Sequence, residues 1–179
     1  MKVLLVVDVQ NDFVTGALAN TEAQARIPRI KEKIQQRIDE GWQVIFTQDT
    51  HWEATYDSSS EGKYLPVKHC IDETDGWYIV PELKEFWEGC WRIKKGRFGD
   101  VELYHRINRC LSEPTEEIEL IGFCTDICVI SNALILKAGV IGEDVIISCD
   151  ASCCAGTTPE AHDAAIKVMK SCQVEVYNA

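Results

Sequence analysis

Hydrophobic runs without polar alternation recur along the chain, separated by longer amphipathic segments. Residues 3–7 read Val-Leu-Leu-Val-Val, which is typical of a strand buried on both faces of a parallel sheet. Residues 118–138 begin as a buried strand, turn tightly and continue as a helix. The same reasoning predicts the other strands at residues 44–47, 90–94 (a short edge strand), 145–148 and 174–177.

The segments between these runs show helical spacing. In residues 21–40, isoleucines recur every three or four positions with charged side chains between them, and Gly41 follows as a helix end. Residues 158–170 start with Thr-Pro, which places a capping hydroxyl before a proline at the first helical position. Shorter helices are expected at residues 81–87 and 101–111.

Strands and helices therefore alternate along the whole chain. This alternation predicts a three-layer α/β/α fold with about six mostly parallel strands and helices on both faces of the sheet. The 179 residues contain no long linker rich in Gly, Ser or Pro and no break in composition, so we expect one domain over residues 1–179.

The composition narrows the class of partner. A formal net charge of −11 argues against a general nucleic-acid or anionic-membrane partner, because both require a basic surface. The apolar run at the N-terminus spans only five residues before Asp8, too short for a signal sequence or a membrane span. A small-molecule substrate is the partner that fits this composition.

The cysteines indicate a reducing compartment. The chain has nine of them, an odd number, and Cys153 and Cys154 are adjacent, so a framework of disulfides is not favoured. We expect free thiols and a cytoplasmic location.

Cys128 lies in the first turn of the helix predicted within residues 118–138. With Thr125 as the N-cap, its thiol would lie near free backbone N–H groups and the positive end of the helix dipole, which favour a thiolate. A free cysteine is more commonly a small buried apolar side chain, and the local sequence alone does not decide between these roles. A base and a cation elsewhere in the chain would favour catalysis.

Asp8 follows the first predicted strand directly. Ligands of open parallel sheets bind beyond the carboxyl ends of the strands, so this carboxylate is a candidate for chemistry, with a turn or capping role as the alternative. The residues after it lack the Gly-x-Gly-x-x-Gly pattern, and a dinucleotide site is therefore not supported.

A second polar set follows the strand at 44–47. Asp49 and His51 are two residues apart, and Glu61 and His69 lie downstream in the same loop-rich region. Imidazole and carboxylate together suit a divalent transition metal such as zinc, iron or manganese. Spacing through a loop is weakly specific, because four polar loop residues are more often surface residues than ligands.

Five motifs together resemble a known family. They are Val-Val-Asp-Val-Gln-Asn-Asp-Phe (6–13), Thr-Gln-Asp-Thr-His (47–51), Pro-Val-Lys-His-Cys (66–70), Lys-Gly-Arg-Phe (95–98) and Gly-Phe-Cys-Thr-Asp-Ile-Cys-Val (122–129). In order and spacing they resemble the isochorismatase-like cysteine hydrolases, and most closely the nicotinamidase (pyrazinamidase) branch. The resemblance spans nearly the whole chain and implies a six-stranded parallel sheet.

The resemblance implies a catalytic triad of Asp8, Lys95 and Cys128. In this chemistry the aspartate takes the thiol proton, the lysine stabilises the thiolate, and the thiolate attacks an amide carbonyl to form a thioester. The backbone N–H groups of Cys124 and Cys128 would form the oxyanion hole. The resemblance also implies a cis peptide bond between Phe123 and Cys124.

The metal ligands of the family match residues of this sequence with one departure. Nicotinamidases commonly hold a metal with an Asp and two or three His residues, and the metal holds the pyridine nitrogen of the substrate. Asp49, His51 and His69 match this pattern, but the usual intermediate histidine is absent from residues 55–58. Glu61 resembles the glutamate variant of the site and is the expected fourth ligand, with zinc as the first choice of metal and iron or manganese as alternatives.

The function expected from this resemblance is hydrolysis of nicotinamide to nicotinate and ammonia. Phe13, Trp52 and Trp77 are candidates for an aromatic wall around a planar substrate, with core packing as the default for each. Within the family, hydrolysis of an N-carbamoyl or ureido compound would use the same triad without a pyridine-binding metal. Homo-oligomers are common in the family, although no stretch of this sequence identifies an interface.

From another functional class, the protein could be a non-catalytic redox sensor. Cys124 and Cys128 are separated by three residues, so their turn is conceivable as an oxidation switch. A disulfide between them after mild oxidation, with function unchanged in Cys128→Ala, would favour this alternative.

Overall fold

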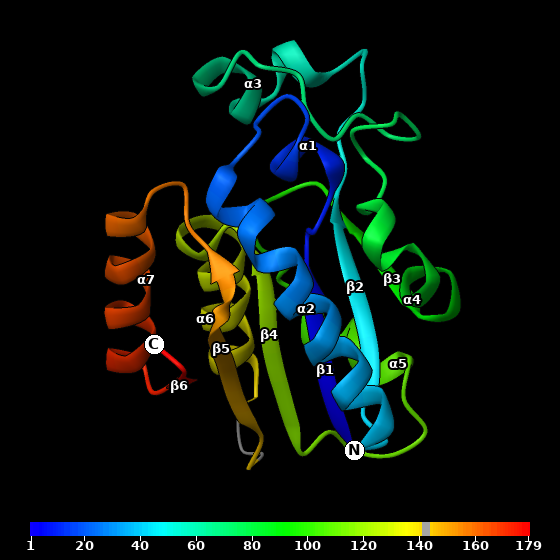
Figure 1. Cartoon of the computed structure of the whole chain (residues 1–179), viewed down its shortest axis with the longest axis vertical. Coiled ribbons are helices and arrows are strands. Elements are labelled where there is room, and N and C mark those ends of the chain that lie inside the picture. Colours follow the sequence, from blue (N-terminus) through cyan, green and yellow to red (C-terminus); the bar gives the residue numbers. More distant parts are fainter. Residues whose placement is uncertain (141–143) are drawn as a thin grey trace.

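The six strands form one parallel sheet in the order β3-β2-β1-β4-β5-β6 (Figure 1). The computed structural model describes residues 1–140 and 144–179. The strands are β1 (Lys2–Val7), β2 (Gln43–Asp49), β3 (Trp91–Lys95), β4 (Glu117–Phe123), β5 (Ile146–Ala155) and β6 (Glu175–Tyr177). This arrangement confirms the fold class predicted from the alternating pattern, including the edge position of β3.

Helices cover both faces of the sheet. The longer ones are α2 (Thr21–Asp39), α4 (Lys84–Gly89), α5 (Leu103–Arg109), α6 (Ile130–Gly139) and α7 (Pro159–Ser171). In β1, Val3, Leu5 and Val7 pack in the core that contains α5, α6 and α7, whereas Leu4 and Val6 pack in the core of α2 and α4. The first strand is continuously apolar because it has a core on each face.

Short elements surround the carboxyl ends of the strands. Helices α1 (Asn11–Val14) and α3 (Ser60–Tyr64), with single 3-10 turns at Tyr56–Ser58 and Pro81–Leu83, belong to the connections that follow β1 and β2. Figure 1 shows α1 and α3 together above this end of the sheet. The functional candidates of the sequence lie on or next to these elements. Within the described residues, no helix combines the length and the apolar character needed to cross a membrane.

Two segments differ from the prediction. Strand β5 continues to Ala155, beyond the strand predicted at residues 145–148; the register against β4 shifts between Leu120 and Gly122, which lets the strand resume its pairing. Gly122 allows the close approach of β4 to β1, because a Cβ there would lie 2.1 Å from the Val7 carbonyl oxygen.

The second difference is the helix start near Cys128. Thr125–Val129 forms one π-helical turn before α6, with Cys124 in the capping position and a bond from the Val129 N–H to the Cys124 carbonyl. The prediction of Thr125 as the side-chain N-cap is therefore wrong, because its hydroxyl instead pairs with His162 Nδ1 at 2.8 Å. The peptide bond between Phe123 and Cys124 is cis, as the resemblance implied.

Candidate functional site

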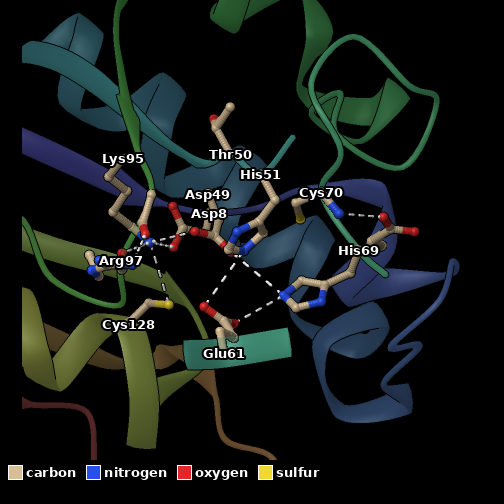
Figure 2. Close-up of polar contacts among 12 residues, drawn as sticks. Asp8, Asp49, Thr50, His51, Glu61, His69, Cys70, Lys95, Arg97 and Cys128 are labelled. Atoms are coloured by element: carbon tan, nitrogen blue, oxygen red, sulfur yellow. Dashed lines mark hydrogen bonds and ion pairs between the residues drawn. The ribbon is translucent and has the colours of Figure 1, made fainter. Parts of the chain in front are cut away.

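Asp8, Lys95 and Cys128 meet at the carboxyl end of the sheet, although they come from the turn after β1, from β3 and from the π-helical turn after β4 (Figure 2). The Lys95 ammonium lies 2.6 Å from Asp8 Oδ2 and 3.6 Å from Cys128 Sγ. All three side chains are buried. The sequence-predicted base, cation and thiol are therefore in mutual contact.

The position of Asp8 depends on the turn that ends β1. Its backbone φ of 49° lies in the left-handed region, which residues with a Cβ rarely adopt. In this conformation the carboxylate accepts a hydrogen bond of 2.7 Å from the Thr47 hydroxyl on β2 and faces Lys95. Burial raises the pKa of Asp8, and the neighbouring Asp49 raises it further, whereas Lys95 opposes the rise. A carboxyl group in this environment has an increased tendency to accept a proton.

The Cys128 thiol is neutral in this environment. Burial raises its pKa well above the usual value, the charge of Lys95 lowers it, and Asp8 and Asp49 raise it. The expectation of a thiolate stabilised at a helix N-terminus is thus not met in the resting site, because two carboxylates and burial outweigh one ammonium group. Its interaction with the Asp8 carboxylate also raises the pKa of the thiol, which makes Asp8 the candidate acceptor for the thiol proton.

Lys95 remains a cation. Burial lowers its pKa, but the carboxylates of Asp8 and Asp49 raise it by more. Its ammonium group also donates a 2.9 Å hydrogen bond to the Arg97 carbonyl in the turn after β3. Lys95 is the last residue of β3, so the strand itself directs its side chain to the carboxyl end of the sheet.

Asp49, His51, Glu61 and His69 form a second cluster next to this triad. One donor atom from each lies within 4.8 Å of the others. His51 Nε2 is 3.0 Å from Asp49 Oδ2 and 3.6 Å from Glu61 Oε2. His69 Nε2 is 3.7 Å from the same Asp49 oxygen and 3.3 Å from Glu61 Oε1. The structure thus brings the four sequence-predicted metal ligands together from β2, α3 and two loops (Figure 2).

The charges in this second cluster favour a bound cation. Burial raises the pKa of Asp49, but hydrogen bonds from His51 and His69 and the charge of Lys95 lower it by more, so Asp49 is ionised. Burial lowers the pKa of His69, yet Asp49 and Glu61 raise it to about 10. Two carboxylates therefore hold a proton on an imidazole where a metal ion would take its place.

The donor set fits a divalent transition metal. Ligand atoms bound about 2.0–2.2 Å from one zinc ion lie roughly 3.3–3.6 Å apart in a tetrahedron. The four contacts between a histidine and a carboxylate span 3.0 to 3.7 Å, and all the donor atoms lie within 4.8 Å of one another. Asp49 Oδ1 is buried without a hydrogen bond to the described residues. Two imidazoles and two carboxylates are consistent with zinc, iron or manganese.

A cavity of about 420 Å³ joins the two clusters. Its polar lining includes Asp49, Glu61, His69, Cys124 and Cys128. The rest of the wall is mostly apolar and includes Phe13, Leu18, Leu65, Phe98 and Ile127. The cavity therefore offers a small planar molecule an apolar wall, a thiol and a group of metal-binding side chains.

The structure brings only one of the three aromatic side chains of the expected wall to the cavity. Phe13 lines the cavity, but Trp52 and Trp77 do not belong to its lining. Trp52 is 59% exposed on the loop after β2. Trp77 is buried with its indole N–H donating to the Thr50 hydroxyl at 2.9 Å. The structure therefore brings neither tryptophan to the cavity: the Trp52 side chain is largely exposed, and Trp77 supports a neighbouring loop.

Two supporting residues escaped the sequence analysis. Thr47 bonds to Asp8, and the side-chain amide of Gln10 clamps the backbone of Asp49, donating to its carbonyl at 2.9 Å and accepting from its N–H at 2.7 Å. Both residues are buried and polar. A polar side chain within or next to an otherwise apolar strand was the available signal for each of them.

Comparisons with known proteins agree with this geometry. The family model of the isochorismatase domain matches residues 2–179. The nicotinamidase/pyrazinamidase of Mycobacterium tuberculosis is 28% identical over 98% of both chains. The structure of nicotinamidase/pyrazinamidase from Bacillus subtilis is 27% identical, with a TM-score of 0.81 over 98% of both chains. That of the pyrazinamidase of Pyrococcus horikoshii in complex with zinc is 25% identical, with a TM-score of 0.78 over 99% of both. The chain belongs to the isochorismatase family.

Proposed function

We propose that the protein is a metal-assisted cysteine amidohydrolase that converts nicotinamide to nicotinate and ammonia. The observation that carries this proposal is the contact among Asp8, Lys95 and Cys128 beside a four-residue metal-binding cluster in one cavity. The relatives named nicotinamidase or pyrazinamidase support the choice of substrate.

The reaction starts with the neutral thiol. Asp8 takes the Cys128 proton as the sulfur attacks the amide carbonyl carbon, and the Lys95 ammonium, 3.6 Å from the sulfur, stabilises the thiolate as it forms. The backbone N–H groups of Cys124 and Cys128 are proposed to donate hydrogen bonds to the developing oxyanion. Asp8 then passes its proton to the leaving nitrogen, so that ammonia departs and a thioester remains.

The second half of the reaction releases the acid. Asp8 removes a proton from a water molecule, which attacks the thioester carbonyl, and the proton returns to sulfur as the carbon–sulfur bond breaks. The raised pKa of Asp8 suits both directions of proton transfer. Throughout the cycle Lys95 keeps its charge and holds the carboxylate at 2.6 Å.

Asp49, His51, Glu61 and His69 are the residues proposed to hold the metal. When bound, the ion would supply a Lewis acid for the ring nitrogen of the substrate. The apolar wall that includes Phe13 would pack against the ring, so that the amide faces Cys128.

The test is release of nicotinate and ammonia from nicotinamide by the purified protein with zinc, iron or manganese supplied, with Cys128→Ala as the blank. Pyrazinamide serves as a second substrate. We expect release that depends on Cys128 and is lost in the presence of a chelator. No release with any of the three metals would refute the proposal. Activity on N-carbamoyl compounds that survives chelation would replace it with the carbamoyl alternative.

A further inference from the structure

Tyr56 packs against the metal-binding residues His51 and His69 and against helix α3, and contacts this region through its hydroxyl, its ring and its backbone. The side chain is 1% exposed. Its hydroxyl oxygen is 2.8 Å from the carbonyl oxygens of Leu65 and Val67 and 3.1 Å from His69 Nδ1. None of the roles assigned above uses this residue.

The groups around His69 Nδ1 indicate which ring nitrogen carries the hydrogen. Val67 O, an acceptor only, lies 2.9 Å from His69 Nδ1, so this nitrogen carries a hydrogen. Tyr56 has one proton, which it donates to a carbonyl, and its lone pair is then available to accept from His69 Nδ1–H. A neutral His69 therefore has its free lone pair on Nε2, the atom that faces Asp49 and Glu61.

The ring and backbone of Tyr56 contact the other ligands. The phenol ring packs edge-on against His51, with centroids 5.2 Å apart, and against His69 at 5.5 Å. The Tyr56 carbonyl accepts a 2.6 Å hydrogen bond from the hydroxyl of Ser59, the N-cap of α3, which carries Glu61. Helix α3 also lies close to this carbonyl, because a Cβ on Gly62 would come within 2.1 Å of it.

We propose that Tyr56 is a positioning residue for the metal site: its hydroxyl holds His69 in the Nδ1–H form that presents Nε2 to the ion, and its ring and backbone orient His51 and Glu61. The inference rests on the metal site of the proposed function. Mutation of a group that orients a metal-binding histidine commonly weakens the affinity for the metal 10–100-fold. Tyr56 would make this contribution from the segment in which the family's usual intermediate histidine is absent.

The test is the zinc affinity of Tyr56→Phe, which deletes the hydroxyl and keeps the ring. We expect a Kd about 10–100-fold weaker than that of the unmodified protein, measured by competition with a chromophoric chelator. With zinc in saturating excess, ammonia release should recover most of its kcat, which general damage to the fold would not allow. Tyr78→Phe is the matched control, since Tyr78 packs among aromatic rings outside the cavity lining and should leave the affinity unchanged.

The outcomes separate this inference from the proposed function. Absence of zinc binding by the unmodified protein would overturn the metal site itself. Binding by Tyr56→Phe within twofold of the unmodified protein would overturn only the role of Tyr56. If the variant does not fold, nitrogen-15 NMR of the zinc-loaded unmodified protein decides: a proton on His69 Nδ1 supports the inference, and a proton on Nε2 overturns it.

Discussion

Two buried clusters of charge lie on the same sheet, and they differ in how completely their charges are paired. In the first, which we call the α2 network, Lys33 and Arg37 of α2 face Glu119 of β4 and Asp150 of β5. Lys33 lies 3.1 Å from Glu119 and 2.7 Å from Asp150, and Arg37 Nε lies 2.6 Å from Glu119. The Tyr177 hydroxyl donates to Glu119 as well.

The second of these charged clusters combines the triad with the metal-binding residues at the carboxyl ends of the strands, and its charges do not cancel. Asp8, Asp49 and Glu61 face one fixed cation, Lys95, so with both histidines neutral two negative charges are in excess. Asp8 Oδ2 and Asp49 Oδ1 are both buried, and both rely on the same cation, since the Lys95 ammonium lies 2.6 Å from the first oxygen and 3.6 Å from the second. In the α2 network, by contrast, two cations face two carboxylates, so the charges cancel.

This difference indicates what each cluster is for. Buried charges that are paired and hydrogen-bonded attach a helix to a sheet without needing any other partner. A buried excess of negative charge costs free energy unless a proton or a cation compensates it. The excess in the second cluster equals the charge of one divalent ion, and a cavity gives access to it. Mutations in the second cluster should therefore affect activity, and mutations in the α2 network should affect stability.

The largest expected effect is that of Cys128→Ala. Removing the nucleophile should reduce ammonia release from nicotinamide on the order of 10⁴-fold, while the free energy of unfolding in urea changes by less than about 1 kcal/mol. Cys153→Ala is the matched control, because Cys153 is equally buried but packs in the core of α2 and α4. It should cost about 1 kcal/mol of stability and leave the activity intact. Retention of more than about 1% of the activity by Cys128→Ala would contradict the assigned nucleophile.

Next in size is the loss of a metal ligand. Glu61→Gln removes one carboxylate charge without touching the triad, and should weaken zinc binding about 100-fold. Excess zinc should raise the Tm of the unmodified protein, because the ion binds only the folded chain, and should raise that of the variant less at the same concentration. Glu85→Gln is the control, since Glu85 is a surface residue paired with Lys31. Equal thermal shifts for Glu61→Gln and the unmodified protein would show that Glu61 is not a ligand.

In the α2 network, Lys33→Met should affect stability and not catalysis. The variant leaves Asp150 and part of Glu119 without a cation in a site where the lysine side chain is 11% exposed. We expect a loss of about 2 kcal/mol in the free energy of unfolding and a Tm lower by roughly 5 °C. Lys31→Met on the same helix breaks a solvent-exposed pair and should cost less than about 0.5 kcal/mol. A lower kcat per folded molecule in Lys33→Met would contradict the prediction that the α2 network affects stability and not catalysis.

The sequence predicted much of the catalytic cluster because its residues end strands. Asp8 follows an apolar run that can only be a buried strand, and parallel strands bring their carboxyl ends together. Lys95, the assignment of Glu61 as the fourth ligand and the cis bond before Cys124 came from the resemblance, since no pattern of polarity distinguishes a ligand from a surface loop residue. The expected fold followed from periodicity alone.

The residues that sequence reasoning missed act through tertiary contacts. Thr47 reaches Asp8 because β1 and β2 pair with Val7 opposite Thr47, a register that no local signal specifies. Tyr56 sits in a single 3-10 turn, and its partners are backbone carbonyls ten or so residues away. The π-helical turn at Cys128 was missed because capping preferences locate a helix start only to within a residue or two.

The smallest expected effect is the pH dependence of stability, which has opposite signs for a carboxylate of the α2 network and for one of the second cluster. Burial raises the pKa of Asp150, but hydrogen bonds from Lys33, Ser152 and Asn178 lower it by more, so the folded value lies below the unfolded one. Its contribution to stability is therefore present above about pH 4 and is lost as the pH falls through the folded pKa. Asp8, whose pKa is raised, has the opposite sign: folding favours its protonated form.

Asp150→Asn tests this sign directly. At pH 7 the variant should be less stable than the unmodified protein by about 1 kcal/mol, because the buried Asp150 side chain loses its ion pair with Lys33 while Glu119 still pairs with that lysine. The difference should shrink as the pH falls below about 4, because the stabilisation by the charged carboxylate is lost as the pH approaches the lowered pKa of the folded state. Urea unfolding at pH 7, 5 and 3 measures it. A difference that stays constant over this range would mean that the charge of Asp150 contributes nothing and that only its hydrogen bonds hold β5 and the C-terminal residues together.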